Sequence, residues 1–351
     1  MTLVCPYKTL SFWQKGDGFM AKIGMIGAGS WGTALTWLLT NNGHQVTVWS
    51  ALEKEIEMLK NCREQKEKLP GVYLSEQVEF TTVLSSAIEE KDLLVLAVPS
   101  PFTRSTAHQM KKHVSEKQIV VNVAKGIEEA TLKTLSEVIE GEIPQADVAV
   151  LSGPSHAEEV GKGIPTAIVA GAHNEKTAKY IQSIFMNESF RVYVSRDVSG
   201  IELGAALKNV VALAAGIADG LGCGDNTKAA LITRGIYEIS RLGVKMGGKP
   251  ETFSGLSGIG DLIVTCASTH SRNRMAGMLI GQGYSMEEAM AGVKMVVEGV
   301  YSAKAARRLA DRYDVEMPII EQVNQVLFEG KSAAAAVNDL MIRDKKIEID
   351  S

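Results

Sequence analysis

The sequence contains little cysteine, and the cysteines follow no motif. Its 351 residues include four of them, with no Cys-x-x-Cys pair and no neighbouring histidine at the spacing of zinc ligands. We therefore expect no metal site. A chain of this length buries a core without disulfides, so we predict free thiols in the cytoplasm, where thiols stay reduced, at Cys5, Cys62, Cys223 and Cys266.

The sequence also lacks an excess of positive charge. Lysine and arginine number 37 against 41 aspartates and glutamates, which gives a net charge of −4. Binding to nucleic acid requires a clear excess of basic side chains that neutralise phosphates, so we expect no nucleic-acid partner. A small basic pocket for a single phosphate is still compatible with this charge.

Long apolar runs are missing as well. The segment 203–218 comes nearest, but Lys208 and Asn209 interrupt it and it falls short of the roughly 18 apolar residues of a membrane helix. We therefore expect no stable membrane insertion. Residues 1–19 lack the apolar stretch of a signal peptide and precede the first predicted strand, so we predict that they form a dispensable N-terminal extension.

Aromatic residues make up only 6% of the chain, whereas glycine is abundant at 33 residues, which predicts an aliphatic core with closely packed backbones. At roughly 150 residues per domain, the length predicts about two domains. Short apolar runs alternate with helical patterns over 20–197, which predicts an α/β Rossmann-type domain, a doubly wound parallel sheet with helices on both faces. Strands are expected at 22–26, 45–49, 93–98, 119–123, 148–151 and 191–194, and helices at 52–60, 102–113 and 131–140.

Strand-like runs disappear after residue 197. The helical periodicity beyond it predicts a separate all-α C-terminal domain over 198–345, with a charged tail at 346–351. Its helices are expected at 199–219, 226–246, 285–292, 299–312 and 318–328.

A glycine-rich turn follows the first predicted strand and opens the first helix. Gly27, Gly29 and Gly32 form the pattern G-x-G-x-x-G. Between a strand and a helix this pattern is typical of dinucleotide binding. The first glycine permits the turn, the second lets a pyrophosphate approach the backbone, and the third lets the helix pack on the strand. The alternative is an ordinary glycine-rich connection.

The end of the second predicted strand does not decide between cofactors. An acidic side chain at this place binds a ribose hydroxyl and repels a 2′-phosphate. The strand ends at Ser50-Ala51, with no acid before Glu53 and only Lys54 as a nearby cation. We therefore expect NAD or NADP as the cofactor and predict no preference.

Polar residues follow two further strands, at the edge where open α/β sheets bind ligands. Lys125 is a candidate for contact with substrate or cofactor, the alternative being a solvated surface lysine. Gly153 and Ser155 offer backbone and hydroxyl groups to a phosphate or polyol. Alternatively, Ser155 is the N-cap of a helix that begins near Glu158. His156 is expected to be structural.

Polar residues also interrupt the helical domain. Lys208 lies in an otherwise apolar helix, where desolvation lowers the pKa of a lysine toward the range useful for proton transfer, unless it is a surface lysine. Asp261 is expected either to cap a helix or to orient Lys208. Donors suited to a phosphate, or alternatively a charged helix start, are provided by Ser271, Arg272 and Asn273.

Several motifs resemble those of one enzyme family in order and spacing: GAGSWGTAL, NVAKGIE, LSGPSHAEEV, ELGAALKNVVALAAGIADG, GLSGIGDLIVTC, the triplet SRN and VVEGV. From about Lys22 to Met341 the chain is similar to the bacterial-type soluble NAD(P)-dependent glycerol-3-phosphate dehydrogenases. The resemblance implies a homodimer that reversibly reduces dihydroxyacetone phosphate to sn-glycerol 3-phosphate, the backbone precursor of phospholipids.

The resemblance also implies roles for individual residues. Lys208 matches the family's proton acceptor, with Lys125 and Asp261 completing the catalytic set. The family often has arginine or histidine where this chain has Ala51. Cofactor contacts match Gly27, Gly29, Ser30, Trp31, Gly32, Ala51, Lys125, Ala157, Arg272, Val296 and Glu298. Substrate contacts match Lys125, Gly153, Ser155, Lys208, Asp261, Ser271, Arg272 and Asn273.

Two other functions stay open at this point. Related two-domain enzymes that act on hydroxy acids or ketopantoate also place a lysine and an asparagine on the first long helix. The SRN triplet and the GLSGIGD segment argue against them. A dinucleotide-binding sensor without turnover is the second alternative, and it would need no lysine at position 208.

Overall fold

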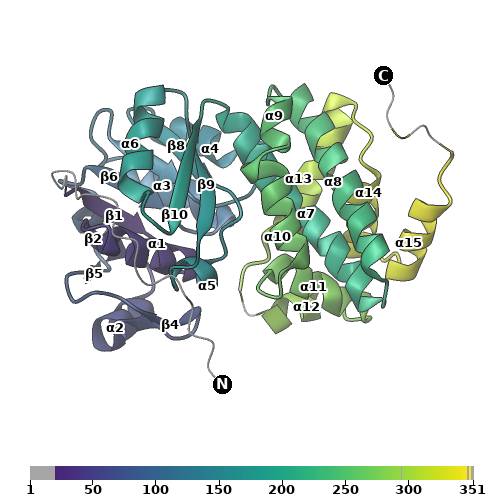
Figure 1. Ribbon diagram of the computed structural model, residues 1–351, viewed down its shortest axis with the longest axis horizontal. Coiled ribbons are helices and arrows are strands. Elements are labelled where there is room, and N and C mark those ends of the chain that lie inside the picture. The colour runs from purple at the N-terminus through teal and green to yellow at the C-terminus, as the bar shows by residue number, and fades with distance from the viewer. Residues whose placement is uncertain (1–19, 294, 346–347, 349–351) are drawn as a thin grey trace.

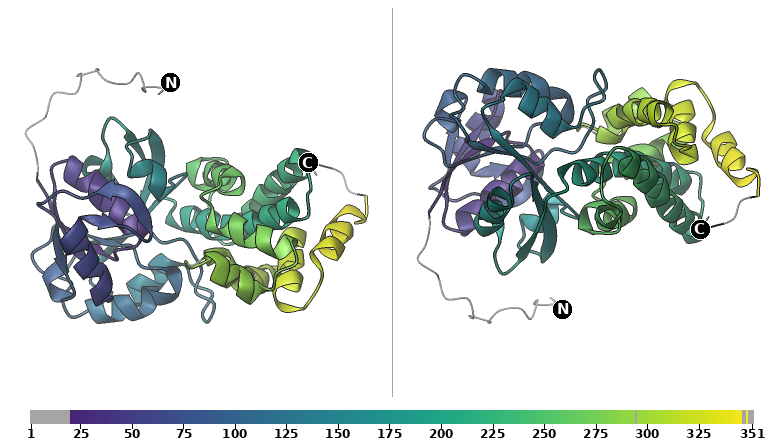
Figure 2. Two further views of the ribbon diagram at one scale, coloured as in Figure 1. Left: turned by 90° about the horizontal axis from the view of Figure 1, so that it is seen from below. Right: turned by 90° about the horizontal axis from the view of Figure 1, so that it is seen from above.

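The computed structural model describes residues 20–293, 295–345 and 348. The extension predicted at 1–19, with Cys5, lies outside the described residues, as does most of the predicted tail. The described part of the chain forms a sheet-containing half and a helical half that lie side by side (Figure 1, Figure 2).

The main sheet of the sheet-containing half contains eight strands in the order β10-β9-β8-β7-β6-β1-β2-β5. β1 lies between β6 and β2 and pairs with both in parallel. The apolar strands are buried because helices cover both faces. The strands are β1 (Lys22–Ile26), β2 (Gln45–Trp49), β5 (Glu79–Thr81), β6 (Leu93–Leu96), β7 (Ile119–Asn122), β8 (Asp147–Ser152), β9 (Thr166–Ala172) and β10 (Phe190–Ser195).

The predicted Rossmann-type arrangement is confirmed, but the expectation of a wholly parallel sheet is wrong at one place. β9 pairs with β8 in antiparallel fashion, and β10 then pairs with β9 in parallel. The connection from β8 to β9 contains only the four-residue helix α5 (Ala157–Val160). A parallel return requires a crossover helix long enough to span the sheet, so the chain runs back beside β8 instead.

Helices pack on the two faces of the sheet. One face is covered by α1 (Ser30–Asn41) and α6 (Glu175–Phe185), the other by α3 (Thr103–Met110) and α4 (Leu135–Glu142). The sequence did not predict α6, β9 or β5, nor the small hairpin of β3 and β4. The remaining elements of this half are α2 (Glu53–Cys62), β3 (Glu64–Gln65), β4 (Leu69–Tyr73), η1 (Ser85–Ala87) and η2 (Ser100–Phe102).

The helical half is arranged around α7 (Val198–Gly220), which is buried along almost its whole length. Within the described residues, α7 is the one helix long and apolar enough to cross a membrane, and 94% of that apolar window is buried inside the protein. It is therefore the core helix of this half. The surrounding helices are α8 (Asp225–Lys245), α9 (Pro250–Phe253), α10 (Asp261–Ala267), α11 (Arg272–Gly281), α12 (Met286–Val293), α13 (Glu298–Tyr313), α14 (Pro318–Phe328) and α15 (Ala333–Met341).

The close backbone packing predicted from the glycine content is confirmed between α7 and α11. A Cβ on Gly277 would lie 2.2 Å from the carbonyl oxygen of Leu213, so the two helices meet at backbone distance. Free thiols are also confirmed for Cys62, Cys223 and Cys266.

Candidate active site

The glycine-rich turn lies between β1 and α1, at the carboxyl edge of the sheet. Gly27 has a φ of +124°, and a Cβ there would lie 2.8 Å from the carbonyl of Ala97. A Cβ on Gly32 would lie 2.2 Å from the carbonyl oxygen of Gly27. Both positions therefore require glycine, one for the turn and the other for helix packing.

The middle glycine of the turn faces open space. A Cβ on Gly29 would meet no atom within 4 Å, and no side chain caps the N-terminus of α1. The first turn of α1 has no acidic residue, so nothing opposes an anion at its positive end. These features suit the pyrophosphate of a dinucleotide. Ser30 and Trp31 follow directly in the first turn.

A hairpin that the sequence did not predict supports this turn. Gln65 in β3 donates a hydrogen bond of 2.9 Å from Nε2 to the carbonyl oxygen of Ala28. Gln65 is completely buried, and its contact holds the peptide between the first two glycines. No local pattern marks this glutamine, because the contact forms only when β3 and β4 fold over the turn.

An acid does lie at the end of β2, although the sequence did not reveal it. Ser50 donates a hydrogen bond of 2.7 Å to Oε2 of Glu55, which also forms a short ion pair with Lys68. Glu55 is buried, whereas the Lys68 side chain is 30% exposed. The acid comes from α2 rather than from the strand end, while Ala51 is exposed beside it. A partly exposed cation paired with a buried acid therefore lies at this place.

Three predicted catalytic residues come together in one buried cluster. Nζ of Lys208 lies 2.5 Å from Oδ1 of Asp261, and Nζ of Lys125 lies 2.7 Å from Oδ2. Lys125 also donates to the carbonyl oxygen of Gly153 at 3.0 Å. The expectation that Asp261 orients Lys208 agrees with these contacts, and the alternative of a surface lysine at 208 is wrong because its exposure is 4%.

The local backbone explains how Lys208 and Asp261 meet. Gly204 lies one helical turn before Lys208, and a Cβ there would come within 2.7 Å of the carbonyl oxygen of Ser257. The residues 256–260 form a π-helical turn, which leads directly into α10 with Asp261 as its first residue. The glycine on α7 therefore lets this turn approach, so that Asp261 at the start of α10 lies beside Lys208 on α7.

One member of the cluster was missed in the sequence. Thr265 accepts a hydrogen bond of 2.6 Å from Nζ of Lys208, and its own hydroxyl donates to the carbonyl oxygen of Asp261 at 2.6 Å. Thr265 follows Asp261 by four residues on α10, so the two side chains share a face. That spacing was the available signal.

Burial and charge shift the pKa values of the cluster in opposite directions. Burial lowers the pKa of Lys208 to about 7, against the opposing attraction of Asp261. Burial also acts to raise the pKa of Asp261, but the ammonium groups of Lys125 and Lys208 outweigh it and hold the carboxyl below its ordinary value. The cluster thus combines an ionised carboxylate with a lysine able to gain or lose a proton near neutral pH.

The segment after β8 borders this cluster. Gly153 has a φ of +152°, and its carbonyl oxygen accepts from both Lys125 and the hydroxyl of Ser155. The alternative of Ser155 as an N-cap is wrong, because α5 begins at Ala157 and His156 occupies the cap position. Burial, and then the charge of Lys208, lowers the pKa of His156.

The predicted phosphate-binding triplet lies at the N-terminus of α11. Ser271 is the N-cap and accepts from the backbone N–H of Arg274 at 3.2 Å. Asn273 uses its amide inside the protein, donating to Asn209 at 2.9 Å and accepting from the backbone N–H of Gly299 at 2.8 Å. Each of the two residues therefore uses some of its polar atoms for hydrogen bonds within the protein.

Arg272 is the cation available at this helix start. Its Nη1 donates to the carbonyl oxygen of Val296 at 3.3 Å, and its side chain has no ion pair among the described residues. Glu298, at the start of α13, accepts from the backbone N–H of Ser100 at 3.1 Å and from its hydroxyl. This contact joins the helical half to the turn after β6. The sequence did not predict the contact.

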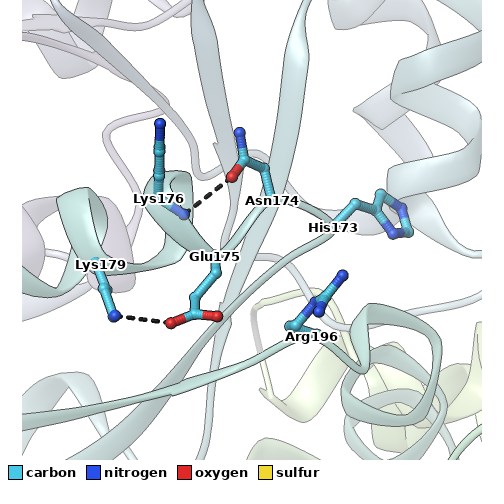
Figure 3. Close-up of a pocket in the computed structure, with 6 residues that line it drawn as sticks. All are labelled: His173, Asn174, Glu175, Lys176, Lys179 and Arg196. Carbon is cyan, nitrogen blue, oxygen red and sulfur yellow. Dashed lines mark hydrogen bonds and ion pairs between the residues drawn. The ribbon is translucent and has the colours of Figure 1, made fainter.

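One surface hollow lies away from all these residues. It has a volume of about 630 Å³ and is formed where α6 begins and β10 ends. Figure 3 shows Glu175 paired with Lys179 along one wall, at 2.7 Å. The hollow shares no residue with the lysine–aspartate cluster. Its lining residues are His173, Asn174, Glu175, Lys176, Lys179 and Arg196.

Two family models match most of the chain. Residues 22–178 match the NAD-dependent glycerol-3-phosphate dehydrogenase N-terminus, and residues 197–338 match the C-terminus of the same family. The chain belongs to the NAD-dependent glycerol-3-phosphate dehydrogenase family.

Individual glycerol-3-phosphate dehydrogenases resemble the chain over nearly its full length. The NAD(P)+ enzyme of Agathobacter rectalis is 66% identical over 332 residues, which cover 95% of this chain and 99% of the relative. That of Bacillus subtilis is 50% identical, covering 94% and 97%. The crystal structure of glycerol-3-phosphate dehydrogenase from Coxiella burnetii has a TM-score of 0.89 at 35% identity, covering 92% of this chain and 99% of that one.

A more distant likeness concerns the fold alone. A ketopantoate reductase from Ralstonia eutropha has a TM-score of 0.58 at 17% identity. The shared two-part architecture explains why the sequence left related dehydrogenases open as an alternative. The family matches decide between them.

Proposed function

We propose that the chain reversibly reduces dihydroxyacetone phosphate to sn-glycerol 3-phosphate with NADH or NADPH, supplying the glycerol backbone for phospholipid synthesis. The observation that carries this proposal is the buried cluster of Lys208, Asp261 and Lys125. It lies at the same edge of the sheet as the glycine-rich turn, where a bound nicotinamide dinucleotide would supply or accept the hydride.

Lys208 is the proposed proton donor and acceptor. As negative charge develops on the carbonyl oxygen of the substrate, the Lys208 ammonium stabilises that charge and transfers its proton to the oxygen. In the oxidation direction, neutral Lys208 takes the proton of the alcohol. Asp261 and Thr265 hold Lys208 in place by the contacts of 2.5 and 2.6 Å.

Lys125 is the proposed second cation of the site. Its ammonium is held between Asp261 and the carbonyl of Gly153, and its side chain is 18% exposed. A group that is partly exposed at the border of the cluster is suited to contact both substrate and cofactor. Its positive charge also opposes protonation of Lys208, which keeps that lysine ready to give up its proton.

Arg272 is the proposed partner of the substrate phosphate, with Ser271, Asn273, Gly153 and Ser155 around it. A guanidinium at the N-terminus of α11 combines charge with helix polarity, and both favour a phosphate. Holding the phosphate positions the carbonyl group beside Lys208. Cofactor contacts are proposed for the glycine-rich turn, Ser30, Trp31, Ala51, Ala157, Val296 and Glu298.

The domain division belongs to the same proposal. We propose two domains, over 20–197 and 198–345, which meet between the end of β10 at Ser195 and the start of α7 at Val198. A cytoplasmic homodimer without membrane insertion is also proposed.

A direct assay tests the proposed function. Purified protein is mixed with dihydroxyacetone phosphate and either NADH or NADPH, and the loss of nicotinamide absorbance is followed. We expect turnover with at least one cofactor, and none when dihydroxyacetone replaces its phosphate at the same concentration. Cofactor binding without any turnover would favour the dinucleotide sensor instead.

A further inference from the structure

Glu202 is a buried carboxylate that takes no part in the proposed proton transfer or substrate binding. It lies on α7 in the helical half, with an exposure of 6%, and its side chain reaches into the sheet half. Its Oε1 accepts from the backbone N–H of Ser136 at 2.9 Å and from Nδ2 of Asn122 at 3.3 Å. The hydroxyl of Ser136 binds its other oxygen.

The two partners of Glu202 lie at opposite ends of one loop. Asn122 is the last residue of β7, and Ser136 lies in the first turn of α4. The loop between β7 and α4, residues 123–134, carries Lys125. A single carboxylate on α7 therefore fixes where this loop begins and where it ends.

Asn122 extends this contact to the neighbour of Lys125. Its Oδ1 accepts from the backbone N–H of Ala124 at 3.1 Å, and its Nδ2 also donates to the carbonyl oxygen of Ala124 at 3.2 Å. The next residue is Lys125, whose ammonium binds Asp261. An unbroken series of hydrogen bonds thus connects Glu202 with the residue before Lys125.

Joining two parts of a protein through a buried carboxylate carries a free-energy cost. Removing a charged or strongly polar group from water destabilises the fold unless hydrogen bonds replace the lost hydration, whereas an apolar contact carries no such penalty. A buried polar network in which every group is paired does, however, specify one arrangement of its members. The arrangement specified here is that of the Lys125 loop relative to α7, the helix that carries Lys208.

We propose that Glu202 is a positioning residue for Lys125, holding both ends of its loop so that the ammonium lies where the reaction requires it. This inference rests on the proposed function, because the role of Lys125 belongs to that proposal. Glu202 acts through Lys125 and does not touch the reacting atoms.

A double-mutant cycle between Glu202 and Lys125 tests the proposal. We expect Glu202→Ala to lower kcat/KM for dihydroxyacetone phosphate by roughly 10- to 100-fold, because small misplacements of a catalytic group have effects of this size. Lys125→Ala is expected to lower it further, and the double variant to match Lys125→Ala within about threefold. In Glu202→Ala the Kd for NADH, measured by fluorescence, is expected to change by less than about threefold. This change is smaller than the expected loss in kcat/KM.

Two further variants distinguish a loss of positioning from a loss of folding. Asn122→Ala removes the hydrogen bonds between Glu202 and the start of the loop. It is expected to lower kcat/KM as Glu202→Ala does. Combined with Lys125→Ala, it is expected to cause no further loss in kcat/KM. Glu202→Gln keeps an acceptor oxygen for the backbone N–H of Ser136, and the hydroxyl of Ser136 can accept from the new amide. It is expected to keep kcat/KM within about threefold of wild type.

Glu238 offers a matched control. It is also a buried glutamate, and it accepts from the backbone N–H groups of Ile319 and Ile320 at the start of α14, outside the site. Glu238→Ala is expected to lower the Tm and leave kcat/KM within about twofold of wild type.

The outcomes separate the two proposals. Without turnover by the wild-type protein, the proposed function itself fails. With wild-type turnover, losses that multiply in the double variant overturn the role of Glu202, as does wild-type kcat/KM in Glu202→Ala.

Discussion

The glycine-rich turn and the lysine–aspartate cluster act together in the proposed reaction, but they are built in different ways. The turn is one continuous segment, and its function depends on side chains that are absent at Gly27, Gly29 and Gly32. The cluster joins residues far apart, since Asp261 follows Lys208 by 53 residues and Lys125 by 136. The turn is therefore fixed by local sequence, whereas the charged cluster exists only after the two halves pack together.

The two sites also depend on different forces. The turn presents backbone N–H groups, which carry no titratable charge. The cluster depends on ammonium and carboxylate groups in a buried place, where charges interact more strongly and pKa values move. Changes to the cluster should therefore alter the chemical step and its pH dependence, and changes to the turn should alter cofactor binding.

The largest effect is expected from Lys208→Ala. Removing a general acid and base of this kind lowers kcat by roughly 10²- to 10⁴-fold, because proton transfer loses its partner. The Kd for NADH, measured by fluorescence, should stay close to that of wild type because the turn is intact. A kcat within a few-fold of wild type would remove Lys208 from the mechanism.

A smaller effect is expected from Arg272→Ala, at the start of α11. Losing a charge-assisted contact to a phosphate should raise the KM for dihydroxyacetone phosphate by roughly 10- to 100-fold, in line with the strength of such bonds. Steady-state kinetics with varied substrate measures this change. Arg272→Lys, which keeps the charge, serves as the control, and an unchanged KM in the alanine variant would place the phosphate elsewhere.

Gly32→Ala breaks the turn and leaves the cluster intact. The new Cβ would lie 2.2 Å from the carbonyl oxygen of Gly27, so α1 must move away from the strand. We expect the Kd for NADH to rise about tenfold, in keeping with a helix start displaced from the phosphates. Gly141→Ala, where a Cβ would meet no atom within 4 Å, is the matched control. Equal binding by both variants would contradict this role of the turn.

The smallest effect concerns stability and a buried acid outside both sites. Burial raises the pKa of Glu238 from its ordinary value of 4.5 to about 8. Between these values the folded protein holds a proton that the unfolded chain releases, so the free energy of unfolding falls as the pH rises. Glu238→Gln lacks this proton, and its Tm, measured by thermal scans, should fall less than that of wild type over the same range. Parallel Tm curves for the two proteins would show that Glu238 does not titrate there.

The sequence predicted what depends on local patterns. Each expected strand lies within two residues of an observed one, because buried strands of a parallel sheet are continuous apolar runs. The glycine-rich turn was predicted from the glycine spacing together with its place between a strand and a helix. Lys208 stood out because a charge within an otherwise apolar helix is expected to be buried together with its neighbours.

Features that depend on tertiary contacts could not be predicted from the sequence. Glu55 reaches the end of β2 from a helix, and Gln65 reaches the turn from a hairpin. Both residues have the appearance of surface positions in a polar segment. The antiparallel β9 is a short apolar run rich in small residues, a pattern that does not by itself distinguish a strand from a buried helical segment. The contacts of Asn273 also depend on tertiary structure, because its amide links α7 to the start of α13.

The pH dependence of glycerol 3-phosphate oxidation tests the role of Lys208 most directly. The neutral amine is the base in this direction, and its pKa is about 7, so kcat/KM of the wild-type protein should rise as the pH passes through this value. Lys208→Arg keeps a positive charge that does not dissociate, so it should be slow and should lack this rise. The same rise in Lys208→Arg, at a comparable rate, would contradict the assignment of Lys208 as the proton acceptor.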